Sequence, residues 1–232
     1  MNYFRIENTL TVLHIGKQAR IDGEAARHIR DSRRMKAGDE IEIQDATPAR
    51  YKARIVELAK SAVIVEPFEE MVLPCEPSKQ ITLLQALIAE QNINMVLQKV
   101  TELGVSHIML FQAERSPHMV KADRLEHKLT RWQRILESAC EQSGRTNPPS
   151  LTVVNTLNDA LEHMQGTLVL LEHTAPITPP IGDVTLVVGP EGGLTDTEKN
   201  AVLAIPQVTT LSIGTYTLRA ETAAIAGVAR LI

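Results

Sequence analysis

The stretch VTLVVGPEGGLTDTEK, residues 184–199, decides the fold of the C-terminal part of the chain. It starts with an apolar, largely β-branched run, which predicts a buried strand. The run ends at two consecutive glycines, Gly192 and Gly193, which accept positive φ and let a backbone approach a ligand closely. Thr195 stands three residues before Glu198, the capping-box spacing that opens a helix. The stretch therefore predicts a strand, a ligand-accessible loop and a helix.

A second stretch, LSIGTYTLRAETAA at residues 211–224, repeats this pattern. We expect a strand over 209–213, a break at Gly214 and a new helix that starts within 219–222. Two strand-to-loop-to-helix turns so close in sequence place both loops at the carboxyl edge of one sheet. Open α/β folds bind ligands at that edge.

From residue 80 up to these two stretches, the sequence alternates between strand and helix patterns. Strands are expected over 81–88, 105–111, 151–154 and 167–172, and helices over 92–103, 124–143 and 157–165. Alternation of this length predicts an α/β fold with a mainly parallel sheet and helices on both faces.

Residues 1–71 predict a smaller, β-rich domain. Strands are expected over 3–6, 10–14, 40–44, 50–58 and 62–67, with one helix over 23–35. Short strands at this spacing suggest a compact barrel, a fold that often presents a face or loop to oligonucleotides. The segment EEMVLPCEPSK, residues 69–79, contains two prolines and little periodicity. We place the domain boundary there, between 1–71 and 72–232.

Composition bounds the function further. The formal net charge of −4 argues against a wholly cationic nucleic-acid coat. Residues 1–71 carry 12 basic and 12 acidic side chains and residues 72–145 carry 9 and 8, whereas residues 146–232 carry 3 and 8, so a polyanion should prefer the first two segments. Cys75 and Cys140 are isolated, which predicts reduced thiols and no structural zinc. With no signal peptide and no long apolar run, we expect a soluble, cytoplasmic protein without membrane association.

The expected N-terminal helix carries the densest positive charge of the chain. Spacings of three and four residues put Arg27, Arg30 and Arg34 on one helix face, with Arg33 nearby. Guanidinium groups match phosphate oxygens bidentately, so this face is a candidate RNA contact, together with Arg5. The alternative is an ordinary solvated face that Glu24 and Asp31 neutralise in part.

Several common enzyme signatures are missing. There is no GxGxxG after a strand and no GxxxxGK[ST], which removes the main marks of Rossmann dinucleotide binding and of P-loop NTPases. There is also no GxSxG elbow and no HExxH pair, and the seven histidines lack metal-ligand spacing.

Six short motifs together resemble the RsmE family of SPOUT-class RNA methyltransferases. They are QKVTELGV (98–105), ERS (114–116), RW (131–132), EQSGR (141–145), GPEGG (189–193) and LRAETA (218–223). They occur in the family's order and spacing, and RMKAGDEI (34–41) fits the family's PUA-like N-terminal domain.

The resemblance implies a specific reaction. The family uses S-adenosyl-L-methionine to methylate N3 of a uridine in 16S ribosomal RNA of the small subunit. It works as a homodimer, and its C-terminal domain carries a trefoil knot that holds the cofactor. By resemblance, the cofactor-binding residues are Leu171, Glu172, Gly189, Pro190, Gly193, Ser212, Ile213, Gly214 and Leu218.

Methylation at uridine N3 needs a proton acceptor and a group that stabilises the developing anion. Arg219 suits the second role, because arginine does not act as a base at ordinary pH. Glu191 and Glu221 are the candidate bases, and the alternative for Glu221 is that it caps its helix.

The chain departs from the family pattern where RNA contacts are expected. Basic residues usual in the family are replaced or missing near Tyr3, Ala89, Asn92 and Tyr216, which should weaken phosphate binding. Two other readings therefore stay open. One is a SPOUT methyltransferase that acts on another RNA or atom, and the other is an RNA-binding ribosome-assembly factor with weakened catalysis.

Overall fold

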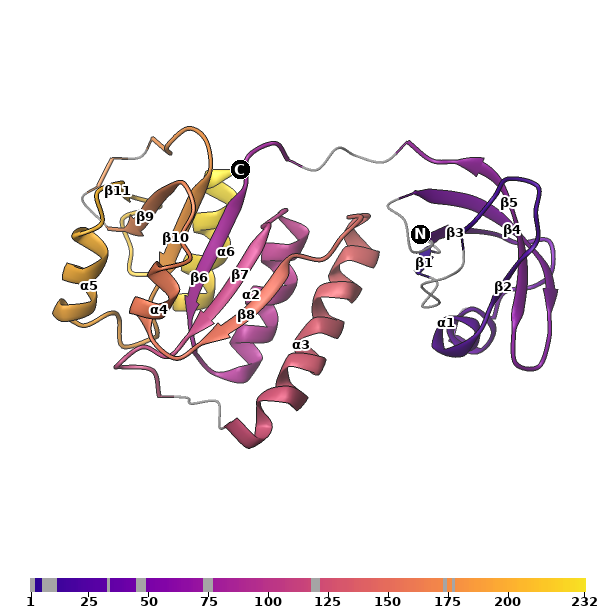
Figure 1. The fold of residues 1–232 in the computed structure, drawn as a ribbon, viewed down its shortest axis with the longest axis horizontal. Coiled ribbons are helices and arrows are strands. Elements are labelled where there is room, and N and C mark those ends of the chain that lie inside the picture. The colour runs from indigo at the N-terminus through magenta and orange to yellow at the C-terminus, as the bar shows by residue number, and fades with distance from the viewer. Residues whose placement is uncertain are drawn as a thin grey trace. The chain divides into compact units, whose positions relative to one another are not determined.

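The computed structural model describes residues 3–5, 12–32, 34–44, 49–72, 77–117, 122–172, 175–176 and 178–232. The chain divides into two compact units (Figure 1). The first comprises Met1–Cys75 with Glu141–Asn147, and the second comprises Glu76–Cys140 with Pro148–Ile232. Arg33 and Cys75 lie outside the described residues, as do the side chains of Tyr3 and Arg5.

The first unit is built on a five-stranded sheet. Its strands, in spatial order, are β1 (Tyr3–Arg5), β3 (Glu40–Gln44), β4 (Arg50–Leu58), β5 (Val63–Glu70) and β2 (Ala19–Ile21). β1 pairs with β3 in parallel, and the other neighbours are antiparallel. Inward residues of these strands, among them Ile43 and Ile55, form one aliphatic core.

The helix of the first unit is shorter than its sequence pattern predicts. α1 (Gly23–Arg27) continues only as the π-helical turn η1 (His28–Ser32). Ala26 and Ile29 point into the core, which is the apolar face that holds this segment on the sheet. Arg34 adopts φ 52°, a left-handed conformation that a continuing helix does not allow. The predicted helix over 23–35 is therefore wrong beyond Ser32.

The strand predicted over 10–14 is wrong where the structure describes it, and one strand of the structure, β2, was not predicted. Residues 10 and 11 lie outside the described part of the chain, but Val12–His14 have no regular structure and Val12 is exposed. The strand β2 was not predicted, because three residues with one buried apolar side chain, Ile21, show no measurable alternation.

The second unit contains a six-stranded parallel sheet. Figure 1 shows its strands in the order β11 (Val208–Leu211), β9 (Thr167–Leu171), β10 (Val184–Val188), β6 (Ile81–Ala86), β7 (His107–Phe111) and β8 (Ser150–Val154). Every neighbouring pair is parallel. The predicted α/β fold with a mainly parallel sheet, preceded by a small β-rich unit, is thus confirmed.

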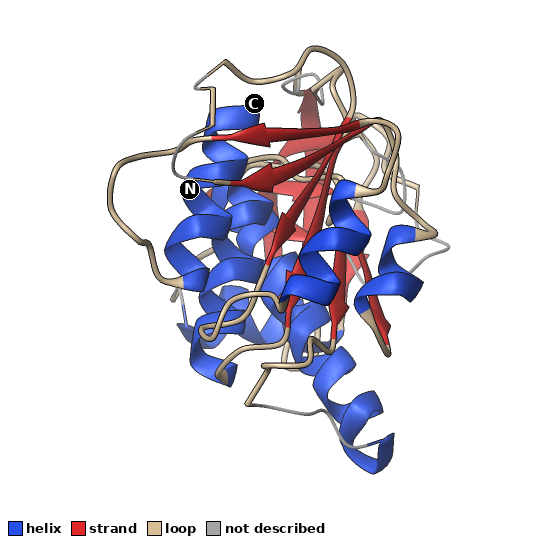
Figure 2. Ribbon diagram, turned by 90° about the vertical axis from the view of Figure 1, so that its left-hand side faces the viewer, coloured by secondary structure: helices blue, strands red, loops and turns tan. Residues whose placement is uncertain are grey.

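Helices cover both faces of this sheet, as Figure 2 shows with helices in blue and strands in red. They are α2 (Glu90–Glu102), α3 (Ala122–Ser143), α4 (Leu157–Leu161), α5 (Asp196–Leu203) and α6 (Ala220–Leu231). One core cluster joins α2, α3 and α6 to the sheet, and a second joins α4 and α5 to its other face. Leu83 packs in the first and Leu84 in the second, which is the period-two alternation of a strand buried on both sides.

Because the strands are parallel, β9, β10 and β11 all end at the same edge of the sheet. The loops that follow them therefore lie together, as the two strand-loop-helix patterns predict. In the described parts of the chain, no helix is long and apolar enough to cross a membrane.

Candidate functional site

A cavity of about 560 Å³ opens at the carboxyl ends of β9 and β10. It lies within the size range of small-molecule sites in proteins. Its walls come from the ends of these strands, the loop after β10, the start of α6 and one residue of α2. The lining residues are Asn92, Leu170, Leu171, Glu172, Val187, Val188, Gly189, Pro190, Glu191, Gly193, Leu194, Lys199, Thr217, Leu218, Arg219, Ala220, Glu221 and Ala223.

The loop after β10 is a tight turn that needs its glycines. Gly193 has φ +70°, and its N–H donates to the carbonyl oxygen of Pro190 at 2.8 Å. A Cβ on Gly192 would lie 3.2 Å from Cβ of Arg115, and a Cβ on Gly189 would lie 3.1 Å from the backbone nitrogen of Leu194. Positive φ and close packing therefore explain why this loop carries glycine.

The same loop is anchored by the helix that follows it. Thr195 is the N-cap of α5, and its hydroxyl accepts the N–H of Glu198 at 3.2 Å, while the Glu198 carboxylate accepts the N–H of Thr195 at 2.8 Å. This is the reciprocal capping box that the sequence predicts. The other oxygen of Glu198 accepts the N–H of Glu114 at 3.0 Å. The loop after β7 is thereby tied to the loop after β10.

The loop after β11 closes the cavity from the other side. The N–H of Ser212 donates to the carbonyl oxygen of Pro176 at 2.9 Å, and Gly214 has φ +155°. A smaller cavity of about 150 Å³ adjoins the first, and Leu171, Glu172, Leu218 and other residues border both. Tyr216 lines this smaller cavity with its side chain largely exposed.

Glu221 is the unusual polar group of the cavity wall. It lies in the first turn of α6, where the helix dipole favours a negative charge, and only 8% of its surface is exposed. Its Oε2 is buried and has no hydrogen-bond partner among the described residues. A buried polar atom normally has a partner, so Oε2 of Glu221 is an exception in the wall of this cavity.

Four other charged groups border the cavity. Arg219 is the N-cap residue of α6, is exposed and forms no ion pair with the described residues. The Glu191 carboxylate accepts the N–H of Ala89 at 3.3 Å and so caps the start of α2. The Lys199 ammonium lies 3.8 Å from the Glu172 carboxylate across the mouth of the cavity.

Comparison with known proteins assigns the chain to a family. Residues 75–232 match the RNA methyltransferase domain family, and residues 21–68 match the RNA methyltransferase PUA domain family. The ribosomal RNA small subunit methyltransferase E of Helicobacter pylori is 30% identical over 78% of this chain and 80% of its own length. The chain belongs to the ribosomal RNA small subunit methyltransferase E family. The Bacillus subtilis member is 28% identical over 96% of this chain and 93% of its own length.

Solved structures of this methyltransferase family share the fold. The ribosomal RNA small subunit methyltransferase E of Neisseria gonorrhoeae, bound to S-adenosyl methionine, gives a TM-score of 0.85 at 30% identity over 99% of this chain and 95% of that one. A putative methyltransferase of Legionella pneumophila, in complex with the same cofactor, gives 0.83 at 28% identity over 98% and 95%.

The structure brings most of the sequence-predicted site residues together. Leu171, Glu172, Gly189, Pro190, Gly193, Leu218, Arg219, Glu191 and Glu221 line the larger cavity. Ile213 and Gly214 line the smaller one, whereas Ser212 is buried behind the loop and borders neither.

Sequence reasoning missed two polar residues of the larger cavity, Asn92 and Lys199. Asn92 lies in the first turn of α2, on a different strand-helix unit from the two glycine loops. Lys199 lies in α5, the helix that directly follows the GPEGG loop. That closeness in sequence is a signal that could have placed Lys199 near the cavity.

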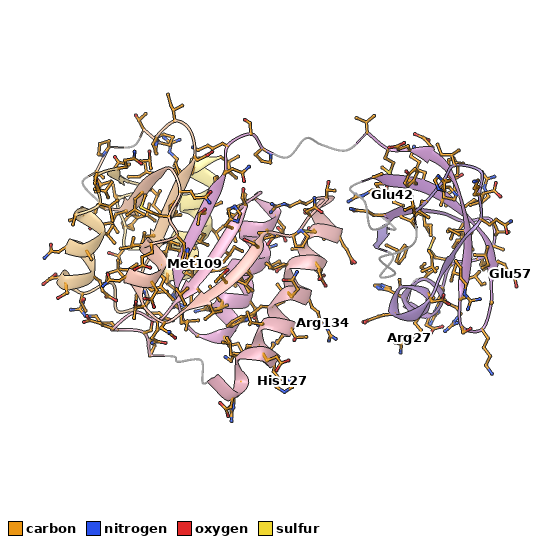
Figure 3. The ribbon with its side chains drawn as sticks, in the orientation of Figure 1. Arg27, Glu42, Glu57, Met109, His127 and Arg134 are labelled. Carbon is orange, nitrogen blue, oxygen red and sulfur yellow. The ribbon has the colours of Figure 1, made fainter. Side chains whose placement is uncertain are left out.

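The N-terminal arginines are not equivalent in this methyltransferase. The Arg30 guanidinium binds Asp31 at 2.9 Å and also donates to the carbonyl oxygens of Ala59 and Lys60. Its hydrogen bonds hold the pKa of the Asp31 carboxyl below its usual range. Arg30 is thus half-buried and engaged within its own unit, whereas Arg27 and Arg34 are exposed. In Figure 3 the Arg27 side chain projects away from α1.

A metal centre finds no support in the described residues, which contain no cluster of histidine, cysteine or acidic side chains able to hold an ion. Cys140 is buried.

Proposed function

We propose that this chain transfers a methyl group from S-adenosyl-L-methionine to N3 of a uridine in 16S ribosomal RNA. Family membership supports this reaction. The observation in the structure that carries it is Glu221, whose buried Oε2 has no partner among the described residues, in the wall of a cavity between two glycine-containing loops. A cofactor site needs such a cavity, and a uridine N–H needs such an acceptor.

The cavity fits the cofactor in size and in chemistry. Leu170, Val188, Leu194 and Leu218 offer apolar walls for an adenine ring. The backbone of the Gly189–Gly193 turn offers polar contacts without side chains, because glycine allows close approach. Glu172 and Lys199 place one negative and one positive group at the mouth, which suits the ammonium and carboxylate of an amino acid. When bound there, S-adenosyl-L-methionine supplies a methyl group on a positively charged sulfur.

The residues at the start of α6 suit the uracil that accepts the methyl group. Uridine N3 becomes a good nucleophile as its proton leaves, so a carboxylate that accepts this proton favours the reaction. We assign this role to Glu221, because its Oε2 is buried beside the cavity and lacks a partner. Arg219 is exposed at the same helix start and suits the charge that develops on the uracil carbonyl oxygens. Glu191 is less suited as base, since its carboxylate caps α2.

The remaining assignments follow the family. We propose residues 1–71 as the PUA-like RNA-binding domain and residues 72–232 as the SPOUT methyltransferase domain. We also propose a trefoil knot, a homodimer that acts on the small ribosomal subunit, and a cytoplasmic location. The exposed Arg27 and Arg34, with Arg5 and Arg33, are proposed RNA contacts, and Arg30 supports them from within the fold.

Two measurements test the proposal. Calorimetry with S-adenosyl-L-methionine should show binding at one site per chain. The purified protein should then restore N3-methyluridine to 16S ribosomal RNA from cells that lack the gene, as read by mass mapping of the RNA. Binding of the cofactor with methylation of another nucleotide would point to a different RNA substrate. Absence of cofactor binding would contradict the proposed enzyme.

A further inference from the structure

A second and larger cavity, of about 970 Å³, forms a groove between α2 and α3 in the second unit. Its walls carry the three amides Gln91, Asn94 and Gln98, the cations Lys99, Arg131 and Arg134, and a histidine, His127. No carboxylate lines it among the described residues. The groove therefore differs in charge from the chain as a whole, which carries more acidic than basic side chains.

The two walls present regular stripes. On α3, His127, Arg131 and Arg134 follow one another at spacings of four and three, so they share one face of the helix. Figure 3 labels His127 and Arg134, and both side chains project from α3. On α2, Gln91, Asn94 and Gln98 share a face in the same way. A row of cations thus faces a row of amides.

The charge of the groove is only partly neutralised. Arg131 is paired with Glu90, and Lys99 lies 2.9 Å from Glu102, so these two cations have partners at the rim. Arg134 is exposed and has no ion pair among the described residues. An unpaired guanidinium beside amide groups is suited to bind a phosphate or the edge of a base.

The start of α2 contributes to both the groove and the proposed methyl-donor pocket. Gln91 lines the groove, and its neighbour Asn92 lines the pocket. From Gln91 the groove follows α2 to Lys99, a distance of about 12 Å at the usual helical rise. That length holds about three nucleotides at the axial spacing of a stacked strand. We take the start of α2 as the point at which a strand with its target base in the pocket would enter the groove.

We propose that the groove between α2 and α3 binds the single-stranded RNA that flanks the target uridine. The proposal rests on the function proposed above and names the surface that holds the substrate. The cations contact phosphates, and the amides contact base edges. Met95 and Ile135 give an apolar surface on which an unstacked base can lie. Arg134 is the central phosphate contact.

The test compares charge reversal at two positions of one helix. Arg134→Glu alters the groove, whereas Arg124→Glu makes the same change at an exposed position of α3 that does not line it. The probes are a short oligouridylate and small ribosomal subunits from cells that lack the gene. We expect Arg134→Glu to weaken RNA binding about tenfold and to lower the salt slope by about 0.7 for each lost phosphate. Arg134→Gln should give an intermediate loss, and Arg124→Glu a small one.

Three results would overturn the groove as an RNA site. These are equal losses for Arg134→Glu and Arg124→Glu, no RNA binding by the unaltered protein, and a change of oligomeric state in Arg134→Glu that accounts for its loss. The last result would make the groove a contact between copies of the chain. Affinity for S-adenosyl-L-methionine should be the same in all variants. If the unaltered protein methylates no 16S ribosomal RNA but Arg134→Glu selectively loses RNA binding, the proposed reaction fails and the groove stands.

Discussion

The Glu198 carboxylate, in the first turn of α5, accepts the backbone N–H of Glu114 at 3.0 Å in the loop after β7. With its other oxygen it accepts the N–H of Thr195 at 2.8 Å. One side chain, 8% exposed, therefore joins two loops that are far apart in sequence. The Arg115 guanidinium adds a second link, a hydrogen bond of 3.3 Å to the carbonyl oxygen of Gly192. The loop of the proposed pocket is thus held from outside the pocket.

Replacing Glu198 by glutamine tests this link. Glutamine keeps one acceptor oxygen and presents an NH₂ group to the other N–H, so one buried donor loses its partner. Such a loss costs about 1–3 kcal/mol. We expect Glu198→Gln to lower the melting temperature and to weaken cofactor binding about tenfold. Glu162→Gln, at an exposed position, is the matched control. Calorimetric affinities that agree between the two variants would show that the link does not position the loop.

Two glycines separate backbone strain from a role in the pocket. Gly193 and Gly182 have φ +70° and +81°, and a Cβ added to either residue would meet no other atom within 4 Å. Alanine at either position should therefore cost a similar free energy of unfolding, about 1–2 kcal/mol, from the left-handed conformation alone. Of the two, Gly193 lines the cavity and Gly182 does not. We expect Gly193→Ala to weaken cofactor binding, measured by calorimetry, while Gly182→Ala leaves the affinity unchanged. Equal cofactor affinities of the two variants would show that Gly193 does not contribute to the cofactor pocket.

The sequence was sufficient for the second unit because its signals are local. The strand Val184–Val188 coincides with its apolar run, and the capping box of Thr195 and Glu198 starts α5 as expected. A strand buried on both faces reads as a continuous apolar segment, and a cap is a pattern of four residues. Because the sheet is parallel, the loops after β10 and β11 then lie at the same edge of it.

The first unit was harder because its short elements depend on distant contacts. β2 is three residues long and exists through its pairing with β5, which no local pattern reveals. The helix beyond Arg27 looked continuous, yet in the described residues the helical turn η1 ends at Ser32 and Arg34 takes positive φ. The role of Arg30 was also hidden, since the carbonyl oxygens that it binds, in Ala59 and Lys60, lie about thirty residues away in sequence.

Glu221→Gln distinguishes a base from a binding group. Glutamine has nearly the same shape but does not accept the N3 proton, so we expect the methylation rate at saturating substrate to fall about 10²–10⁴-fold. Cofactor affinity should change little. Protein stability should hold or increase, because glutamine removes a negative charge from a largely buried side chain.

The control for this experiment is Glu191→Gln. Its carboxylate caps α2 through Ala89, and the amide oxygen of glutamine can still accept that N–H, so stability should change by less than about 1 kcal/mol and the rate should stay within a few-fold. Single-turnover methylation of small subunits measures both rates. A larger effect at Glu191 than at Glu221 would exchange their roles.

Glu90 holds two cations at the rim of the groove between α2 and α3. Its carboxylate binds Lys128 at 3.2 Å and also Arg131. The hydrogen bond from Lys128, followed by the attraction of its charge, lowers the pKa of Glu90. A lowered carboxyl pKa means that any stabilisation from these pairs is present above the usual glutamate range and is lost only as the pH falls below it. At neutral pH, Glu90 therefore offsets positive charge that would otherwise face RNA.

We expect Glu90→Gln to bind RNA several-fold more tightly and to steepen its salt dependence by about 0.7 for each cation released to a phosphate. Stability should change by less than about 1 kcal/mol, since the pair is exposed. Glu126→Gln, which removes the same charge from an exposed position of α3, controls for net charge. Titration of a short oligouridylate at several salt concentrations measures both effects. If Glu90→Gln and Glu126→Gln tighten binding equally, the gain comes from net charge and Glu90 does not regulate the groove.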